Sequence, residues 1–539
     1  MGIKGDVFKI KNHEGSNLDI KSSIHQLDII IILIYVTSLL SLGFWISFRK
    51  NRTTDLFLAG RNLSWGKIGL SIFGTNISPS MMLAACSVAY TTGIVGANFE
   101  WLAWFFLLIL AMLFVPHYLN TKISTMPEFM EYRFEPKCRT FLSWYALFTT
   151  IILWLGGALY SGGLLLAQIT GWQLWICLVF LIAIAASFTV TGGLAAVVIT
   201  DAFQSLLMIA ASILLTILAF SKTGLNNILQ SVPADYWRLF RPANDSVFPW
   251  TAIVLGYPVL GIWFWCTDQT IVQRVLAARN KRQGQLGVLF LGYLKIITPL
   301  MFYIPGILCF VLYPNLETSD QAYLTLVTGL LPTGMVGLII AVLIAALIST
   351  IDSALNSFST IFTLDIYCKK FRPQADQREI RWIGRAMTLF IAVISVLIAL
   401  SMESVGRDLF NLLQGIIAFF APPMATVFLI GVLWRKATST AAFLTLVIGS
   451  IVSLSIGFCQ FKNIPYEGYW PHYLLLSFYL FVSLSAFMIG ISLMTQKNSK
   501  PSPLPTLKDT YAGEHGSKLI WILWGILAVI MAIIYLIFN

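Results

Sequence analysis

The feature that most constrains the fold of this chain is a series of long apolar segments that recurs along its 539 residues. About 20 apolar residues in a helix cross a bilayer core of about 30 Å, and about fourteen segments approach or exceed that length. Charged residues make up 11% of the chain, compared with about 25% in a soluble globular domain. The sequence therefore predicts an all-α polytopic membrane protein with about fourteen transmembrane helices and no appended soluble domain. The segments lie near 27–47, 63–90, 101–120, 140–168, 173–190, 200–221, 249–273, 285–313, 333–364, 382–402, 407–434, 440–460, 470–495 and 518–538.

Basic residues follow alternate apolar segments, the pattern that orients helices with Lys and Arg on the inner side of a membrane. They follow the first, third, seventh and ninth segments: Arg49, Lys50, Arg52, Arg61; Lys122, Arg133, Lys137, Arg139; Arg274, Arg279, Lys281, Arg282; and Lys369, Lys370, Arg372, Arg378, Arg381, Arg385. This placement explains the net charge of +11 without nucleic acid as a partner. It predicts a protein integral to the lipid bilayer of a plasma membrane or bacterial inner membrane. Both termini are predicted outside, although several lysines near the N-terminus run against that orientation.

The second segment contains the run Gly74-Thr-Asn-Ile-Ser-Pro-Ser80. Pro79 lacks a backbone donor and clashes with the carbonyl four residues earlier, so we expect the helix to open near Thr75. One interpretation is a proline kink whose backbone is satisfied by neighbouring small polar residues. The other is a discontinuous helix whose freed carbonyls bind a cation, as in secondary transporters.

A matching interruption, Leu255-Gly-Tyr-Pro-Val-Leu-Gly261, lies in the seventh segment, five segments later. Interruptions at corresponding positions of two halves indicate an inverted repeat with a binding site at the membrane midplane. This favours the discontinuous helix. The predicted organisation is an N-terminal tail, peripheral helix and cytoplasmic loop (1–62), a first repeat (63–221), an extracellular loop (222–248), a second repeat (249–434) and peripheral C-terminal helices (435–539).

Three polar residues stand out within or at the edge of apolar segments, where such groups are costly and often functional. Glu100 opens the third segment and can equally be a residue of the outer surface. Lys295 lies well inside the eighth, where its alternative is to snorkel to the inner surface. Gln414, early in the eleventh, can form an interhelical hydrogen bond instead of binding a ligand.

The ninth segment carries an oxygen-rich face. Ser349, Asp352, Ser353 and Asn356 follow the spacing i, i+3, i+4, i+7 and therefore share one side of a helix. Hydroxyl and carboxylate oxygens suit a hard cation rather than zinc or copper. Close helix packing is the alternative for the small residues, but it does not explain Asp352.

Several separated motifs over roughly residues 50–440 resemble the sodium/solute symporter family: Thr54-Asp-Leu-Phe-Leu-Ala-Gly-Arg61, Asn76-Ile-Ser78, Phe99-Glu-Trp101, Met126-Pro-Glu-Phe129 and Thr191-Gly-Gly-Leu-Ala-Ala-Val197. Its sodium–glucose cotransporter branch is resembled by Trp265-Cys-Thr-Asp-Gln-Thr-Ile-Val-Gln-Arg274, Gly292-Tyr-Leu-Lys295, Phe362-Thr-Leu-Asp-Ile-Tyr367 and Ala421-Pro-Pro423. The resemblance implies a LeuT-type five-plus-five inverted repeat with two broken helices.

The resemblance also implies a sugar site formed by Asn76, Glu100, Lys295 and Gln414, with Phe264 and Trp265 offering flat apolar faces to the ring. Sugar hydroxyls both donate and accept, so carboxylate, amide and ammonium groups can satisfy them together. The chain departs from the family pattern at Phe264, where a gate tyrosine is expected, at Gly261, where a polar residue is common, and at Met81, where Gln or His is frequent. These departures leave a deoxy-sugar, a polyol or a modified hexose as candidates.

Two sodium sites follow from the same resemblance. The first comprises backbone carbonyls of Gly74, Ile77 and Ala346 with the hydroxyls of Ser349 and Thr350. The second comprises Asp201, Ser349, Asp352 and Ser353. Two carboxylates beside one sodium leave a negative charge. The alternatives are that one of the pair is protonated, or that Asp352 pairs with a cytoplasmic-side Arg and binds no ion.

The predicted function is sodium-coupled import of a sugar, with sodium ion as the coupling ion and no covalent chemistry. A sodium symporter for a carboxylate such as a sialic acid or an amino acid is the nearer alternative, in which Lys295 serves as the counter-ion. A sensor or channel on the same fold is the more distant one. The sequence makes no prediction of oligomeric state.

Overall fold

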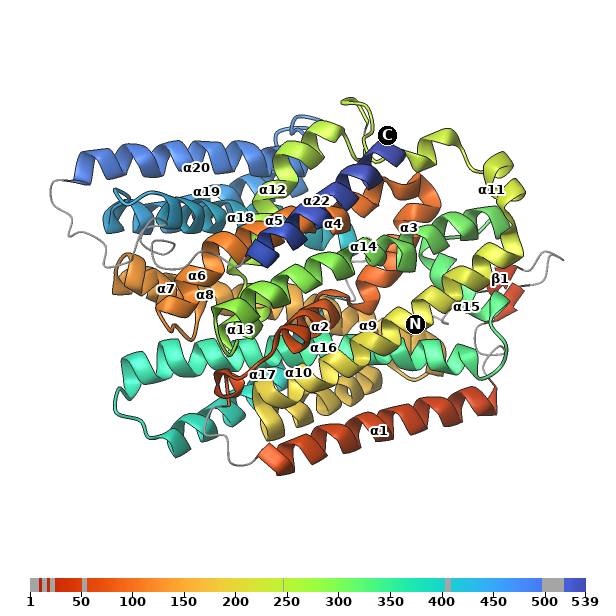
Figure 1. Cartoon of the computed structure of the whole chain (residues 1–539), viewed down its shortest axis with the longest axis horizontal. Coiled ribbons are helices and arrows are strands. Elements are labelled where there is room, and N and C mark those ends of the chain that lie inside the picture. Colours follow the sequence, from red (N-terminus) through yellow and green to blue (C-terminus); the bar gives the residue numbers. More distant parts are fainter. Residues whose placement is uncertain are drawn as a thin grey trace.

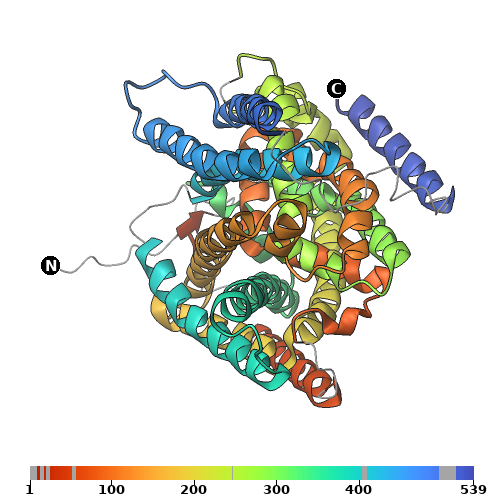
Figure 2. The ribbon, with the colours of Figure 1, turned by 90° about the vertical axis from the view of Figure 1, so that its left-hand side faces the viewer.

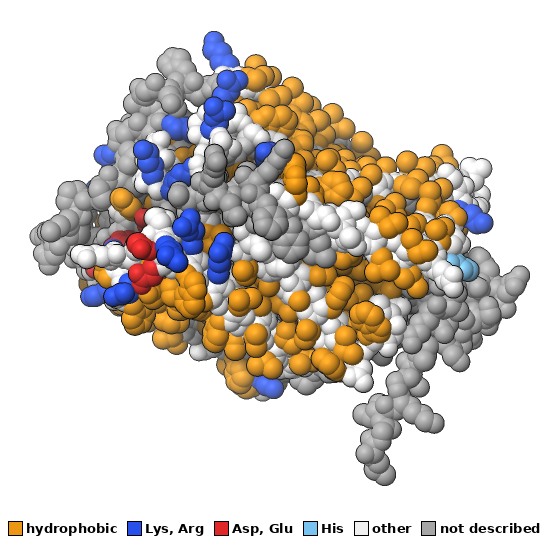
Figure 3. All heavy atoms as spheres, turned by 90° about the horizontal axis from the view of Figure 1, so that it is seen from below, with side chains coloured by type: hydrophobic (Ala, Val, Ile, Leu, Met, Phe, Trp, Pro, Cys, Tyr) orange, Lys and Arg blue, Asp and Glu red, His pale blue; other side chains and the backbone are white. Residues whose placement is uncertain are grey.

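The computed structural model describes residues 9–11, 17–19, 25–50, 56–245, 247–402, 409–496 and 518–539. Long helices run side by side along one direction, which is horizontal in Figure 1. Hydrophobic side chains cover much of the face in Figure 3, while Lys and Arg gather at one end. This distribution is that of a protein whose helices lie along the normal of a bilayer.

Helices of the first half of the chain are α1 (Gln26–Lys50), α2 (Trp65–Asn76), α3 (Pro79–Thr92), α4 (Asn98–Trp101), α5 (Ala103–Ile109), α6 (Val115–Asn120), α7 (Met126–Arg133), α8 (Pro136–Thr149), α9 (Ala158–Thr170), α10 (Leu174–Thr223) and α11 (Leu225–Ser231). Those of the second half are α12 (Tyr257–Gly261), α13 (Gln269–Leu276), α14 (Lys281–Leu312), α15 (Ala322–Leu330), α16 (Met335–Ile361), α17 (Gln377–Ser401), α18 (Leu409–Leu433), α19 (Ser439–Phe461), α20 (Tyr473–Thr495) and α22 (Lys518–Ile537).

Shorter 3-10 and π-helical segments join or extend these helices: η2 (Ala59–Arg61), η3 (Gly93–Ala97), η4 (Leu110–Phe114), η5 (Thr150–Gly157), η6 (Ala234–Trp237), η7 (Ala252–Gly256), η8 (Ile262–Thr267), η9 (Ser319–Gln321) and η10 (Phe362–Phe371). Two short antiparallel strands, β1 (Lys9–Lys11) and β2 (Asn17–Asp19), precede α1, with Ile10 opposite Leu18.

Ten helical spans among the described residues are long and apolar enough to cross a membrane, and two shorter apolar helices accompany them. One of the ten, Leu174–Thr223, contains two of the predicted segments. They are separated at Gly193, which has φ 55° and lies so close to Leu56 that a Cβ there would meet its carbonyl oxygen at 2.3 Å. The count of fourteen spans stays a prediction.

Helix α16 forms the centre of the bundle. In the span Met335–Phe371, 89% of the residues in its most apolar stretch are buried inside the protein, compared with 22% for the C-terminal helix α22. Helices α2, α9, α10 and α17 pack around α16, and Figure 2 shows it enclosed by other helices while α22 lies at the edge. The face that carries the predicted cation ligands is therefore inside the protein.

A buried carboxylate on the first helix forms hydrogen bonds with the start of α16. Asp28 is fully buried, and its Oδ1 accepts hydrogen bonds of 2.7 Å from the backbone N–H groups of Gly334 and Gly337. Its Oδ2 accepts from the N–H of His25 at 3.0 Å, at the start of α1. A carboxylate at a helix N-terminus satisfies free N–H groups and the helix dipole. Gly337 permits the approach, because a Cβ there would lie 2.5 Å from Cα of Asp28.

Candidate binding cavity and buried ion cluster

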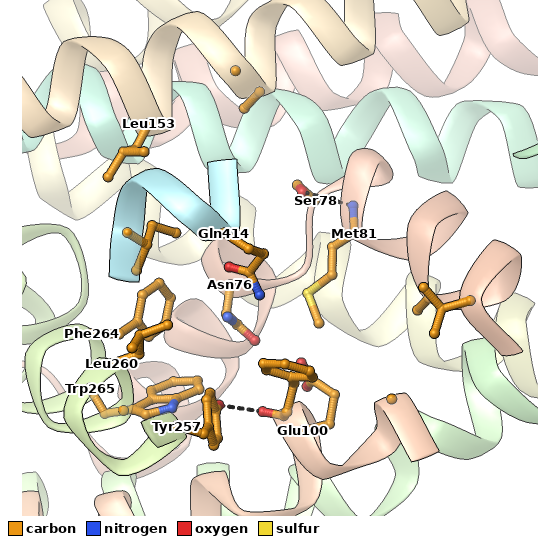
Figure 4. Close-up of a pocket in the computed structure, with 18 of the residues that line it drawn as sticks. Asn76, Ser78, Met81, Glu100, Leu153, Tyr257, Leu260, Phe264, Trp265 and Gln414 are labelled. Atoms are coloured by element: carbon orange, nitrogen blue, oxygen red, sulfur yellow. Dashed lines mark hydrogen bonds between the residues drawn. The ribbon is translucent and has the colours of Figure 1, made fainter. Parts of the chain in front are cut away.

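A cavity of about 210 Å³ lies where the end of α2 meets α3, α4, η5, α12, η8 and α18. Five of the six side chains predicted for the substrate site line it: Asn76, Glu100, Phe264, Trp265 and Gln414. Figure 4 shows the polar ends of Asn76 and Gln414 pointing toward one another beside Met81. Segments distant in the sequence thus bring two amides, a carboxylate and two aromatic rings to one small space.

Lys295, the sixth predicted residue, lies directly behind this lining. Its Nζ donates to Oε2 of Glu100 at 2.5 Å and to Oδ1 of Asn76, and lies 5.0 Å from the centre of the Trp265 ring. Lys295 is 1% exposed and Glu100 is 3% exposed. Snorkelling of Lys295 and a surface position for Glu100 are therefore wrong, and the charges are compensated by pairing, as burial requires.

The break that presents Asn76 to the cavity lies at Ile77 and Ser78, whose backbones are extended. The last helical bond of α2 runs from the N–H of Ile77 to the carbonyl of Phe73, and Ser78 caps α3 by accepting from the N–H of Met81. The expected opening near Thr75 is therefore two residues too early. Pro79 begins the next helix, where a missing N–H costs nothing, so the break precedes it.

The second interruption also differs in position. Residues 252–267 remain helical through the π-helical segments η7 and η8 around α12, and the backbone becomes extended only at Asp268. The Gly-Tyr-Pro run therefore does not open the helix, because a proline near the start of a new helical segment is tolerated. The break instead falls inside the Trp-Cys-Thr-Asp-Gln motif.

Two residues at this break were missed from the sequence. The Trp154 ring stacks on Phe264 with centroids 5.5 Å apart and lines the cavity, and its Nε1 donates to Oδ2 of Asp268 at 3.3 Å. Asp268 also caps α13 by accepting from the N–H of Thr270. The signal for Asp268 was its place in the motif, whereas nothing in an apolar segment distinguishes Trp154 from a lipid-facing tryptophan.

The three residues that depart from the family pattern all line the cavity, and one departure, Gly261, has a local explanation. Gly261 lines the cavity against Phe106, and a Cβ on it would meet Cε2 of that ring at 2.4 Å. A larger polar residue would therefore require Phe106 to move. Met81 and Phe264 both line the cavity and contribute apolar surface where hydroxyl or amide groups were expected.

The residues predicted for the first sodium site lie where the α2 break crosses α16. Oγ1 of Thr350 donates to the carbonyls of Ala346 and Thr75 at 3.1 and 3.2 Å. A methyl group on Gly74 would lie 3.4 Å from Oγ of Ser349, and Ile77 is fully buried at the break. The set consists of neutral oxygens, which suit an alkali cation.

The residues of the second predicted site are joined to the first. Oδ1 of Asp201 accepts from Oγ of Ser349 at 2.6 Å, and Oγ of Ser353 lies 3.4 Å from Oδ1 of Asp352 and 3.0 Å from Oγ1 of Thr75. All four predicted residues are fully buried. Oδ2 of Asp352 has no hydrogen-bond partner within the described chain. An orphaned carboxylate oxygen beside hydroxyl groups is a position that a cation fits.

Arg274 completes this cluster, although its sequence position suggested a cytoplasmic loop. It is fully buried, pairs with Oδ2 of Asp201 at 3.4 Å, and donates to Ser353 and to Oγ of Ser71. The pairing with an Arg considered for Asp352 therefore falls on Asp201. Arg133 and Arg139 are likewise buried rather than exposed in a loop: Arg133 donates to the carbonyls of Gly431, in the last turn of α18, and Trp434, just after it, and Arg139 pairs with Asp365.

Comparison with known families settles the classification. The sequence matches the family model described as the sodium:solute symporter family over residues 56–449. The chain belongs to this family. Among related proteins, a sodium/glucose cotransporter 4 of Danio rerio is 32% identical over 480 residues, covering 82% of this chain and 73% of its own. A sodium/mannose cotransporter of Bos taurus is 34% identical over 464 residues, covering 79% of this chain and 78% of its own.

Solved structures agree on the fold of this family member. A sodium-coupled sialic acid symporter in an outward-open state superposes with a TM-score of 0.76 at 22% identity, covering 89% of this chain and all of that one. Mhp1, a nucleobase-cation-symport-1 family transporter, superposes with a TM-score of 0.55 at 13% identity, covering 82% of this chain and 94% of that one. These structures show the LeuT-type fold of a polytopic membrane protein, and membership of the sodium:solute symporter family makes the chain a transporter, not an enzyme.

Proposed function

We propose that the protein imports a hexose or a related sugar or polyol together with sodium by alternating access. The observation that carries the proposal is the convergence of Asn76, Glu100 and Gln414 on a small cavity bounded by the rings of Phe264 and Trp265. Such a lining offers donors and acceptors to hydroxyl groups and flat apolar faces to a ring. The names of the sodium/glucose and sodium/mannose relatives support the same class of substrate.

The charge of the cavity favours a neutral solute over a carboxylate. None of the described residues that line it is Lys or Arg, and the cation directly behind the lining, Lys295, is already paired with Glu100. A carboxylate substrate would have to leave its own charge uncompensated or displace Glu100 from Lys295, and both are costly in a buried site. We therefore assign Lys295 a role in orienting Glu100 and Asn76 rather than that of a substrate counter-ion.

The proposed coupling ions occupy the two sites described above. The first takes neutral oxygens from Gly74, Ile77, Ala346, Ser349 and Thr350. For the second, Asp201 and Asp352 outnumber Arg274, so one bound sodium neutralises the cluster when both carboxylates are ionised. Each sodium that enters across 100 mV contributes about 2.3 kcal/mol from the potential alone.

In this scheme the two repeats, 63–221 and 249–434, alternate around the cavity, and the stack of Trp154 on Phe264 forms part of its inner closure. We place both termini outside the membrane. The contact of Leu239, in the loop predicted to be extracellular, with the carbonyl of Phe538 supports that side for the C-terminus.

Uptake into proteoliposomes tests the proposal. Purified protein is given labelled hexoses, a polyol, a sialic acid and an amino acid, with and without an inward sodium gradient. We expect accumulation of a sugar or polyol only with the gradient. Accumulation of only an acid supports the carboxylate alternative. Flux of sodium or sugar without coupling supports a channel, and the absence of flux supports a sensor.

A further inference from the structure

The C-terminal helix α22 contacts residues next to both members of the Lys295–Glu100 pair. It runs past α5 and α4 in Figure 1 and stands at the edge of the bundle in Figure 2, and it packs against α14. Its buried residues form one narrow stripe at helical spacing: Ile520, Trp524, Leu527 and Met531. The rest of the helix is largely exposed, so this stripe and the helix end account for its attachment.

The first attachment is to α14, immediately before Lys295. The Tyr293 hydroxyl donates to the carbonyl of Leu523 at 2.7 Å. Gly292 faces Leu527 and Trp524, and a Cβ on it would lie 2.8 Å from Cδ2 of Leu527. The segment of α14 that carries Lys295 is thus packed directly on α22.

The second attachment is to α4, on either side of Glu100. The Tyr535 hydroxyl donates to Oδ1 of Asn98 at 2.9 Å, and the rings of Trp101 and Phe538 lie 5.6 Å apart. The amide nitrogen of Asn98 donates to the carbonyls of Val95 and Leu239. Asn98 is fully buried, so Tyr535 supplies the partner that its Oδ1 otherwise lacks.

A third hydrogen bond joins α4 directly to α14. Nε1 of Trp101 donates to the carbonyl of Ile296, the residue after Lys295, at 3.1 Å. Helices α4, α14 and α22 therefore form a triangle whose bonds lie within two residues of Glu100 and of Lys295. A 2.5 Å ion pair depends on the spacing of the two backbones that carry it, and such spacing is held by the surrounding contacts.

We infer that α22 is a positioning element of the binding cavity. Its contacts act through two positioning residues, Tyr535 on α22 and Tyr293 on α14. The inference rests on the proposed function only for the identity of the ligand. Removal of either hydroxyl loosens the Lys295–Glu100 geometry, and thereby weakens recognition of the sugar without altering the sodium ligands on α16.

The test compares Tyr535→Phe, Tyr293→Phe and the double variant with the parent, using Tyr479→Phe on α20, an exposed tyrosine, as a control. Sugar uptake is measured at saturating sodium, and sodium dependence at saturating sugar. Loss of one hydrogen bond corresponds to about a two- to tenfold effect. We expect the half-saturating sugar concentration to rise by this factor in each single variant, with unchanged sodium dependence and protein amount, and no change in Tyr479→Phe.

A ligand-free readout keeps the inference separate from the proposed function. Hydrogen exchange of peptides covering 95–101 and 292–296 is expected to increase in Tyr535→Phe and Tyr293→Phe, respectively, but not in Tyr479→Phe. If the parent transports no sugar while exchange increases, only the proposed function fails. Unchanged exchange, unchanged sugar half-saturation in a transporting parent, or an equal change in sodium dependence overturns the inference.

Discussion

Arg274 and Asp201 form an ion pair of 3.4 Å in which both side chains are completely buried. They come from α13 and α10, and the serines that surround them belong to α2 and α16. The pair therefore connects four helices next to the proposed sodium sites. Variants that lack this ion pair therefore test both the stability of the protein and its binding of sodium.

Replacement of Arg274 by Gln leaves Asp201 without its cation, which typically costs about 3–5 kcal/mol when the pair is buried. We expect a marked drop in the thermal unfolding midpoint of the detergent-solubilised protein. Arg282→Gln, at an exposed position of α14, is the control. Because the two residues act as a unit, Asp201→Asn combined with Arg274→Gln should destabilise less than the sum of the single changes. An unchanged midpoint in Arg274→Gln contradicts the prediction.

Loss of the Lys295–Glu100 pair should impair sugar recognition. Hydrogen bonds to charged groups contribute about 1.5–3 kcal/mol, so Glu100→Ala and Lys295→Ala should each raise the half-saturating sugar concentration at least about tenfold. Glu317→Gln, at an exposed position, should leave it unchanged. Normal affinity and rate in both alanine variants, at normal protein amounts, would remove these residues from the site.

The first sodium site predicts a defect in sodium dependence. Thr350→Ala removes an oxygen next to the carbonyls of Ala346 and Thr75, and we expect the half-saturating sodium concentration to rise about two- to tenfold. Thr388→Ala is a matched control, because that buried hydroxyl donates only to Gly384 within its own helix. Equal sodium dependence in Thr350→Ala and the parent would count against the site.

A second sodium site predicts the stoichiometry of transport. With Asp352 as a ligand, reversal potentials should give two sodium ions per sugar in the parent and one in Asp352→Ala. The orphaned Oδ2 of Asp352 and the excess of carboxylates over Arg274 are the structural basis. A ratio of one in the parent, or of two in the variant, removes Asp352 from sodium coupling.

Local sequence patterns located the broken helix and the oxygen-rich face of α16 well. The small polar run around Asn76 places the first break to within two residues, because glycine and proline act on the backbone next to them. The shared helix face of Ser349, Asp352 and Ser353 is equally predictable, because it follows from their spacing along a few residues. The grouping of Asn76, Glu100, Lys295 and Gln414 required the family resemblance, since no periodicity connects residues so far apart.

Partners that depend on tertiary contacts were not predictable in this way. Arg274 lies five residues before Arg279 in a basic stretch, so the sequence alone predicts an orienting charge, whereas in the structure it pairs with the buried Asp201. The Gly-Tyr-Pro run near Pro258 looks like a break, yet a change of helical pitch accommodates it. The role inferred for α22 depends on Tyr535 and Tyr293, whose aromatic character is ordinary in any transmembrane helix.

The contact of Asp28 with Gly334 and Gly337 also sets an order of assembly. The residues lie 306 and 309 positions apart, and at about 5–20 residues per second the ribosome needs roughly 15–60 s to synthesise the chain between them. Helix α1 is therefore synthesised long before the N–H groups of α16 that donate to its carboxylate. A fragment that ends before Gly334 lacks this contact altogether, so such a fragment can pack α1 on α10 but cannot fix it to α16.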